Sequence, residues 1–176
     1  MNIIAATRNN EEFERALNSK VNIIFMLTSN IIDIKKQAQS AHKSGKKIFI
    51  HLDFAEGIGK DEYGIRFAKE QGVDGIISTR ANIIKLAKKE NMFALQRFFI
   101  VDSQSINTTV ETLKSSKANM IEIMPGNNPK AVKMLKDKVD VPIIAGGLIE
   151  TEEETKEIIK SGAFAVSTGA QELWNI

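Results

Sequence analysis

Short apolar runs alternate with amphipathic segments along the whole chain. Each run is rich in isoleucine, valine or phenylalanine, and each begins roughly twenty residues or slightly more after the previous one. This spacing leaves room for one helix between successive strands, which is typical of βα units in a parallel sheet. The predicted strands are Ile3–Ala6, Ile23–Leu27, Ile48–Leu52, Gly75–Ser78, Phe98–Val101, Met120–Met124, Pro142–Ala145 and Ala165–Ser167.

The segments between these runs have apolar residues at the spacing of an amphipathic helix. Eight strands with eight helical segments predict an α/β fold, a compact (β/α)8 TIM-type barrel that forms a single domain over residues 1–176. The chain is shorter than the ~200 residues usual for the smallest such barrels, so its helices and loops must be short. A doubly wound open sheet is the alternative, but the first strand is not followed by a Gly-x-Gly-x-x-Gly turn.

Composition adds mainly exclusions. Hydrophobic residues make up 43% of the chain and charged residues 26%, an ordinary globular balance. The absence of cysteine excludes disulfides and thiolate metal sites. Neither a signal peptide nor an apolar stretch long enough to span a bilayer is present, so we expect a cytoplasmic protein without a membrane partner. The formal net charge of +2 gives no electrostatic argument for a nucleic-acid partner.

Paired glycines and small hydroxylated residues follow the last two predicted strands. Gly146 and Gly147 come after the seventh strand, and Ser167 and Thr168 end the eighth. In parallel α/β barrels the loops after the last two strands direct backbone N–H groups and a helix N-terminus at a phosphate. Glycine allows the backbone to approach the anion closely. The sequence therefore predicts a phosphate site here, with a simple Gly-Gly turn as the alternative.

Three acidic or basic side chains are predicted to face the barrel interior. Glu122 lies between two isoleucines that should face the helices, so strand alternation turns its carboxylate inward. His51 and Asp53 share one face of the third strand. A buried carboxylate needs a partner, and a polyol hydroxyl, a water molecule or Arg80 would satisfy it.

Each of these residues also has a structural interpretation. His51 is alternatively a hydrogen-bonded interior residue. Asp53 and Asp102, which are candidate ligand residues because they lie at strand ends, are alternatively helix or turn caps. No inward strand position of the predicted strands carries lysine, which argues against a Schiff-base aldolase. Asp53, Glu56 and Glu122 give only a weak signal for Mg²⁺, so no metal site is predicted.

Six motifs occur in order along the chain and together resemble one known family, the glycerol-uptake operon antiterminator regulatory proteins, which are glycerol-3-phosphate-responsive antiterminators. The likeness covers essentially the whole chain. The motifs are His51–Asp61, Asp74–Arg80, Gln96–Ser103, Glu122–Gly126, Ile144–Ile149 and Ala165–Thr168.

The resemblance implies a regulatory barrel that binds glycerol 3-phosphate without turning it over. It implies binding to leader mRNA of glycerol-catabolism genes, read-through of a terminator, and no cofactor. A homodimer is compatible with it. Carried over by position, the phosphate ligands are Ala145, Gly146, Gly147, Ser167 and Thr168, and the residues at the glycerol end are His51, Asp53, Arg80 and Glu122.

The residues leave other functions open. An enzyme acting on a phosphorylated polyol, such as an isomerase, lyase or glycerophosphate transferase, would use Glu122, Asp53 or His51 as acid–base groups. A metabolic sensor acting through protein partners is a third possibility. RNA binding depends on the resemblance, because lysines on presumed outer helix faces are common on solvated surfaces and no RNP-like aromatic motif is present.

Overall fold

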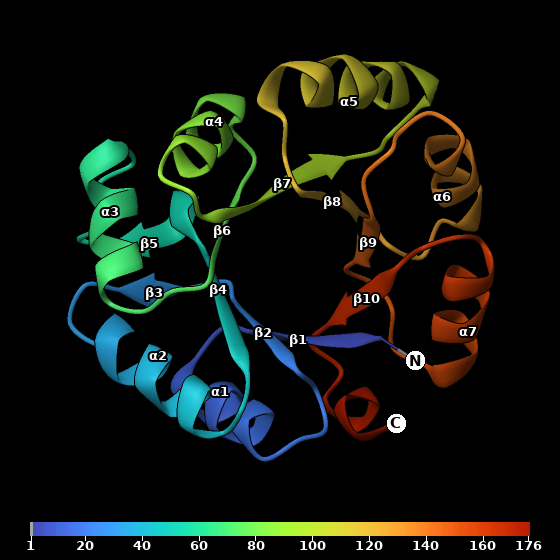
Figure 1. Ribbon diagram of the computed structural model, residues 1–176. Coiled ribbons are helices and arrows are strands. Elements are labelled where there is room, and N and C mark those ends of the chain that lie inside the picture. The colour runs from blue at the N-terminus through green and yellow to red at the C-terminus, as the bar shows by residue number, and fades with distance from the viewer. Residues whose placement is uncertain (1) are drawn as a thin grey trace.

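The strands of the protein close into an eight-stranded parallel barrel in a computed structural model that describes residues 2–176 (Figure 1). Around the barrel the order is β1-β10-β9-β8-β7-β6-β4-β2, and all neighbouring pairs are parallel. The predicted fold class is confirmed. The barrel strands are β1 (Ile3–Thr7), β2 (Ile23–Met26), β4 (Lys47–His51), β6 (Gly75–Ser78), β7 (Phe93–Phe99), β8 (Met120–Met124), β9 (Ile143–Gly146) and β10 (Ala165–Thr168).

Seven α-helices of the described residues surround the barrel (Figure 1). The eighth βα unit ends in a short 3-10 helix, η2 (Gln171–Asn175), in place of the α-helix that the pattern predicts. A second 3-10 helix, η1, follows β4, and the two-residue strands β3 and β5 pair beside α2 and α3. The helices and the two short strands have the bounds α1 (Asn10–Leu17), α2 (Ile34–Lys43), α3 (Glu62–Glu70), α4 (Ala81–Lys89), α5 (Ser103–Ser116), α6 (Pro129–Lys136), α7 (Glu152–Lys160), η1 (Leu52–Phe54), β3 (Ser29–Asn30) and β5 (Ala55–Glu56).

Most helices begin at a side-chain cap, which fixes where each loop ends at the carboxyl edge of the barrel. Asp102 caps α5, where its carboxylate accepts the backbone N–H of Ser105 at 2.8 Å and completes a capping box. Thr151 caps α7 in the same way. Such caps satisfy N–H groups that the first turn cannot pair internally. The capping interpretation of Asp102 is therefore confirmed.

The fifth barrel strand lies earlier than the sequence predicts. We expected Phe98–Val101, whereas β7 spans Phe93–Phe99 and pairs with β8 through the register Arg97↔Glu122. Two polar residues, Gln96 and Arg97, interrupt the apolar run, yet both are buried. Gln96 packs on the outer side of the strand and Arg97 on the inner side, because successive side chains alternate.

The barrel interior has an apolar layer with a polar layer above it. The apolar layer contains Ile4, Phe25, Phe49, Ile77, Leu95, Ile144 and Ala165. Two residues further along three of these strands, on the same inward face, stand the polar side chains of His51, Arg97 and Ser167. The change from apolar to polar side chains places the chemistry at the carboxyl end of the strands, where barrels of this class bind their ligands.

Candidate ligand-binding site

A buried carboxylate is the centre of the candidate site. Glu122 is about 1% exposed, and its Oε2 accepts a hydrogen bond from Arg97 Nε at 2.6 Å. Its Oε1 accepts from Ser167 Oγ at 2.5 Å. Leaving a charged carboxylate unpaired in a barrel would be strongly unfavourable, and these two partners from β7 and β10 offset its desolvation. The inward orientation predicted for Glu122 is confirmed, although Arg97 and not Arg80 is its cationic partner.

Gly146 lets the β9 backbone approach this cluster. A Cβ at Gly146 would overlap both Glu122 Oε1 and Ser167 Oγ, so no larger residue fits without displacing them. The next two residues, Gly147 and Leu148, have φ values of 77° and 58°. A leucine in this left-handed region is uncommon and strained. The backbone after β9 is therefore held in an unusual turn.

The two loops beside these glycines contain backbone N–H groups that no acceptor of the described residues pairs. Among residues 2–176, the N–H groups of Gly147, Leu148 and Gly169 donate to no protein acceptor. They lie in the loops that follow β9 and β10, which are paired strands. Unpaired N–H groups in a turn of this kind form an anion-binding concavity. This arrangement is what the predicted phosphate site requires.

Two predicted elements of the phosphate site have structural roles in the protein. The Thr168 hydroxyl donates to the Ile149 carbonyl at 2.7 Å and accepts the Ala170 N–H at 3.0 Å, so it ties the two loops together. The N-terminus of α7 carries three glutamates in its first turn and is closed by its own capping box. Because these carboxylates already interact with the helix dipole, the α7 terminus is poorly suited to an anion, and the predicted phosphate site would depend on the loop N–H groups.

Arg8 supplies a cation at the same place. A Cβ at Gly169 would lie 3.1 Å from Arg8 Nη1, so the guanidinium lies against the loop after β10. No carboxylate among residues 2–176 lies within 4.0 Å of the Arg8 guanidinium, in contrast to the other four arginines. Those four arginines are Arg15, Arg66, Arg80 and Arg97.

His51 lies between the charged groups of the site with no partner of its own. The ring is about 1% exposed, and neither nitrogen hydrogen-bonds any group of residues 2–176. Burial, reinforced by the positive charge of Arg97 and opposed by Asp53, lowers the pKa of His51 to about 4. The imidazole is therefore neutral near pH 7 and offers one donor and one acceptor. The hydrogen-bonded interior role considered for His51 is not found in the protein itself.

Asp53 connects the ends of β4 and β6. Its carboxylate accepts hydrogen bonds from the Ser78 hydroxyl at 2.7 Å, the Thr79 N–H at 2.8 Å and the Thr79 hydroxyl at 3.0 Å. Arg80 Nε lies 3.5 Å from the carboxylate. Burial raises the pKa of Asp53, but these hydrogen bonds outweigh it and hold the pKa below its usual value. Asp53 thus stays ionised while it organises the turn before α4.

Comparison with known proteins assigns the family. The chain matches the family described as glycerol-3-phosphate responsive antiterminator over residues 3–174. This chain belongs to that family. It is similar to a glycerol uptake operon antiterminator regulatory protein from Listeria monocytogenes, with a TM-score of 0.92, 38% identity, and coverage of 99% of this chain and 95% of that one.

Two further relatives span nearly the whole chain. A glycerol uptake operon antiterminator-related protein from Thermotoga maritima has a TM-score of 0.87 and 33% identity, covering 98% of this chain and 97% of that one. An uncharacterized protein of Escherichia coli K12, YgcP, is 37% identical over 175 residues, which is 99% of this chain and 92% of YgcP. The family assignment therefore applies to the complete barrel.

The sequence analysis assigned no role to two arginines that lie in the site of this antiterminator-family barrel, Arg97 and Arg8. Arg97 has a recognisable signal, because it lies two residues after the interior Leu95 on the same face of β7 and opposite Glu122 in the strand register. Arg8 has only its position directly after β1. The ligand roles assigned to Ala145, Gly146, Gly147, Ser167, Thr168, His51, Asp53, Arg80 and Glu122 stay predictions.

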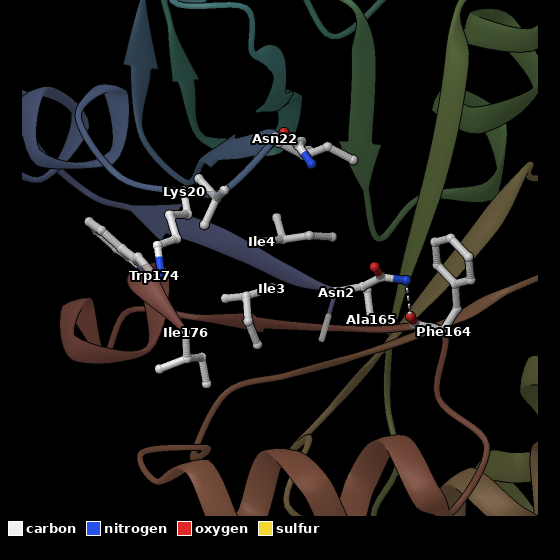
Figure 2. Close-up of a pocket in the computed structure, with 11 residues that line it drawn as sticks. Asn2, Ile3, Ile4, Lys20, Asn22, Phe164, Ala165, Trp174 and Ile176 are labelled. Atoms are coloured by element: carbon white, nitrogen blue, oxygen red, sulfur yellow. Dashed lines mark hydrogen bonds between the residues drawn. The ribbon is translucent and has the colours of Figure 1, made fainter.

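Other features of the antiterminator-family barrel lie apart from this site. A cavity of about 170 Å³ at the opposite end of the barrel is lined by Asn2, Ile3, Lys20, Phe164 and Trp174, among others (Figure 2). Lys47, one residue before the predicted third strand, begins β4 on the same face as His51, but it is exposed at the amino end of the strand, away from the site. Within residues 2–176 no helix is long and apolar enough to cross a membrane. No cluster of three or more metal-ligating side chains occurs in that range.

Proposed function

We propose that this chain is a glycerol-3-phosphate-responsive transcription antiterminator that binds leader mRNA of glycerol-catabolism genes and allows read-through of a terminator. Family membership supports the regulatory class. The observation that supports glycerol 3-phosphate as the ligand is the set of unpaired N–H groups of Gly147, Leu148 and Gly169 beside an inward polar cluster. A small phosphorylated polyol needs these two features side by side.

The phosphate end of the ligand is bound by the backbone after β9 and β10. Ala145, Gly146 and Gly147 bring the chain close to the anion, and the Gly147 N–H donates to it. Ser167 faces the same space but donates its hydroxyl to Glu122 at 2.5 Å, so it joins the phosphate site to the polyol site. Thr168 contributes by holding the β10 loop against Ile149. Arg8 adds the positive charge that backbone donors lack.

The glycerol end is bound by acceptors. Glu122 and Asp53 are carboxylates whose remaining lone pairs accept hydrogen bonds from hydroxyl groups. Neutral His51 has both ring nitrogens available and either donates to or accepts from a polyol oxygen. Arg80, whose side chain is about half exposed, closes this end beside Asp53. These groups bind a hydroxylated ligand and supply no electron or group-transfer chemistry, so the proposal requires no cofactor.

Ligand binding controls RNA binding only through a difference in affinity between two states of the protein. Glycerol 3-phosphate favours the RNA-competent state to the extent that this state binds the ligand more tightly. The same coupling requires RNA to raise the affinity for the ligand by an equal factor. Both directions of the coupling are measurable on the purified protein.

The ligand half is tested by thermal unfolding with glycerol 3-phosphate, glycerol and inorganic phosphate. We expect glycerol 3-phosphate to raise the melting temperature by mass action and glycerol to have little effect. The absence of a shift at millimolar glycerol 3-phosphate would exclude this ligand. The RNA half is tested by titration of leader RNA, whose affinity should fall steeply with salt and change when the ligand is added.

An enzyme acting on a phosphorylated polyol is the second candidate. The observation that favours it is the neutral, unpartnered His51 near the Asp53 carboxylate, which is the arrangement of a general acid–base site. Fold does not discriminate between the two functions, because this barrel supports many chemistries. A phosphorus NMR time course with glycerol 3-phosphate and protein decides between them, since conversion of the ligand favours the enzyme.

A further inference from the structure

Most of the hydrogen-bond donors of Arg97 have no partner among the described residues. A guanidinium has N–H donors on Nε and on both Nη atoms. Only Nε is used, and it donates to Glu122 Oε2 at 2.6 Å, whereas within residues 2–176 no acceptor receives a hydrogen bond from either Nη atom. Arg97 is only 8% exposed. Donors on a nearly buried cation are costly unless another group accepts from them.

The arrangement around Glu122 explains why the Nη atoms stay free. An arginine in a bidentate pair places two of its nitrogens on the two oxygens of one carboxylate. Here Ser167 Oγ occupies Glu122 Oε1 at 2.5 Å, and Arg97 donates only to Oε2, through Nε. The ion pair is therefore monodentate, and the Nη edge of the guanidinium is left for another acceptor.

Strand order shows what stands opposite these donors. In the eight-stranded barrel β7 lies opposite β1 and β4 lies opposite β9, because three strands separate each pair in both directions. At the level of the polar layer β1 contributes Ala6 and β9 contributes Gly146, each two residues beyond an inward isoleucine. No bulky side chain of β1 or β9 therefore stands across the barrel from Arg97 or His51 at this level. The loops that carry the unpaired backbone N–H groups follow β9 and β10, on the side opposite β4.

His51 has the same need for an outside group. Its ring is about 1% exposed, and both nitrogens lack a hydrogen-bond partner within residues 2–176. Burial and the nearby charge of Arg97 lower the pKa of His51 to about 4, so the imidazole is neutral near pH 7. The two side chains do not hydrogen-bond each other, although they come from strands of the same polar layer. Both are therefore satisfied only by a third group between them and the far side of the barrel.

The neighbouring charges select the kind of group. Glu122 accepts from Arg97, and Asp53 lies two residues after His51 in η1. A second anionic group on the ligand would be repelled by these carboxylates. An uncharged hydroxyl fits, because its oxygen accepts from an Nη atom while its proton is donated to a carboxylate lone pair. A ketone oxygen at the same place accepts but has no proton to donate.

We propose that Arg97 is a specificity-determining residue of the ligand site, whose Nη atoms donate to a hydroxyl oxygen at the end of a phosphorylated polyol remote from the phosphate, with His51 completing the contact. This inference rests on the proposed function and adds to it, because the hydroxyl end was assigned there without Arg97. Arg97 then has two roles, the ion pair with Glu122 through Nε and ligand recognition through its Nη atoms.

The test combines two forms of the protein with two ligands, and calorimetry measures each affinity. Arg97→Lys keeps a positive charge beside Glu122 but has no guanidinium edge. Propyl phosphate keeps the phosphate and the carbon chain of glycerol 3-phosphate but has no hydroxyl. We expect Arg97→Lys to bind glycerol 3-phosphate about 10- to 150-fold more weakly than the wild type does, the usual range for one hydrogen bond to a charged group. Its affinity for propyl phosphate should equal that of the wild type.

Leu95→Val is the matched control for disturbance of the strand. Leu95 lies two residues before Arg97 on the same face of β7, in the apolar layer, so its truncation loosens the interior without removing a donor. We expect the ratio of the two ligand affinities in this variant to match the wild type. A merely structural role of Arg97 would leave that ratio unchanged in Arg97→Lys as well, and this result would overturn the proposal.

A crystal structure of the wild type with glycerol 3-phosphate decides the question if Arg97→Lys does not fold. An Nη atom of Arg97 within hydrogen-bond distance of a ligand hydroxyl is the expected result. A phosphate oxygen at that position, or no ligand atom there, would show that Arg97 does not recognise the hydroxyl end.

The same measurements separate failure of this inference from failure of the proposed function. If the wild type does not bind glycerol 3-phosphate, the ligand half of the proposed function is wrong, and this inference with it. If the wild type binds glycerol 3-phosphate and Arg97→Lys loses affinity for both ligands equally, the proposed ligand stands and only the role given to the Nη atoms is wrong.

Discussion

Arg97 and Glu122 face each other across adjacent strands inside the barrel, with Arg97 Nε 2.6 Å from Glu122 Oε2. The second carboxylate oxygen is bound by Ser167, so one buried ion pair joins β7, β8 and β10. This pair forms the polar boundary between the apolar interior and the candidate site, so we expect its loss to affect both stability and ligand binding. Arg97 and Glu122 are therefore the first residues to substitute.

Removing one member of this pair should destabilise the protein. Arg97→Met leaves the Glu122 charge buried without its cation, and we expect a loss of about 3–5 kcal/mol in the free energy of unfolding. Glu122→Gln leaves the guanidinium unpaired and should act similarly. The double variant Arg97→Met/Glu122→Leu should be more stable than Arg97→Met, as urea unfolding measures. Additive losses in this cycle would show that the pair does not act as a unit.

Gly147→Asp should abolish binding of glycerol 3-phosphate. The substitution places a negative charge beside the unpaired N–H groups that we propose bind the phosphate, at a residue whose φ of 77° also disfavours any side chain. Gly147→Ala is the control, because its Cβ would meet only the flexible Met124 side chain and adds strain without charge. We expect Gly147→Ala to lose roughly 1–2 kcal/mol of stability and keep measurable binding by calorimetry. Normal binding by Gly147→Asp would place the site elsewhere.

Arg8→Gln should weaken the ligand without unfolding the barrel. The Arg8 side chain is exposed and has no carboxylate partner among the described residues, so its removal breaks no ion pair. Loss of one charge-assisted hydrogen bond corresponds to about 1.5–3 kcal/mol, or roughly 10- to 150-fold in affinity. Arg15→Gln, which removes an exposed arginine paired with Glu11 on α1, is the control and should bind the ligand normally. Equal affinities for the two variants would remove Arg8 from the phosphate site.

His51 should make stability fall as the solution becomes acidic. Its pKa is about 4 in the folded protein and 6.5 in the unfolded chain, so between these values the unfolded state binds more protons. The contribution of neutral His51 to the free energy of unfolding is therefore fully present above pH 6.5. About 3 kcal/mol of it is lost as the pH falls toward 4. Asp53, whose folded pKa is also lowered, contributes only at lower pH, below its ordinary value of 3.8.

The measurement is the free energy of unfolding at several pH values for the wild type and for His51→Asn. The variant cannot titrate in this range, so its stability should depend less on pH between 6.5 and 4. Parallel pH profiles for the two proteins would show that His51 is not held neutral by burial.

Several features of the barrel follow from local patterns. The number of strands, their order and the inward direction of Glu122 depend on residue alternation and on helix-length spacing, which the sequence displays directly. The position of β7 does not, because Gln96 and Arg97 look like solvent-exposed residues until the neighbouring strands bury them. Propensity describes a segment alone, whereas burial depends on what packs against it.

The sequence by itself determined the fold class, the close approach of the backbone at Gly146 and Gly147, and the acidic residues that face the interior. Only the tertiary structure decided the partners of these residues. Closure of the barrel brings Arg8 against Gly169, Arg97 against Glu122 and Ser167 against Glu122, and it leaves His51 without a partner. These contacts join residues 25 to 161 positions apart, and no local pattern specifies which long-range groups meet when β10 pairs with β1.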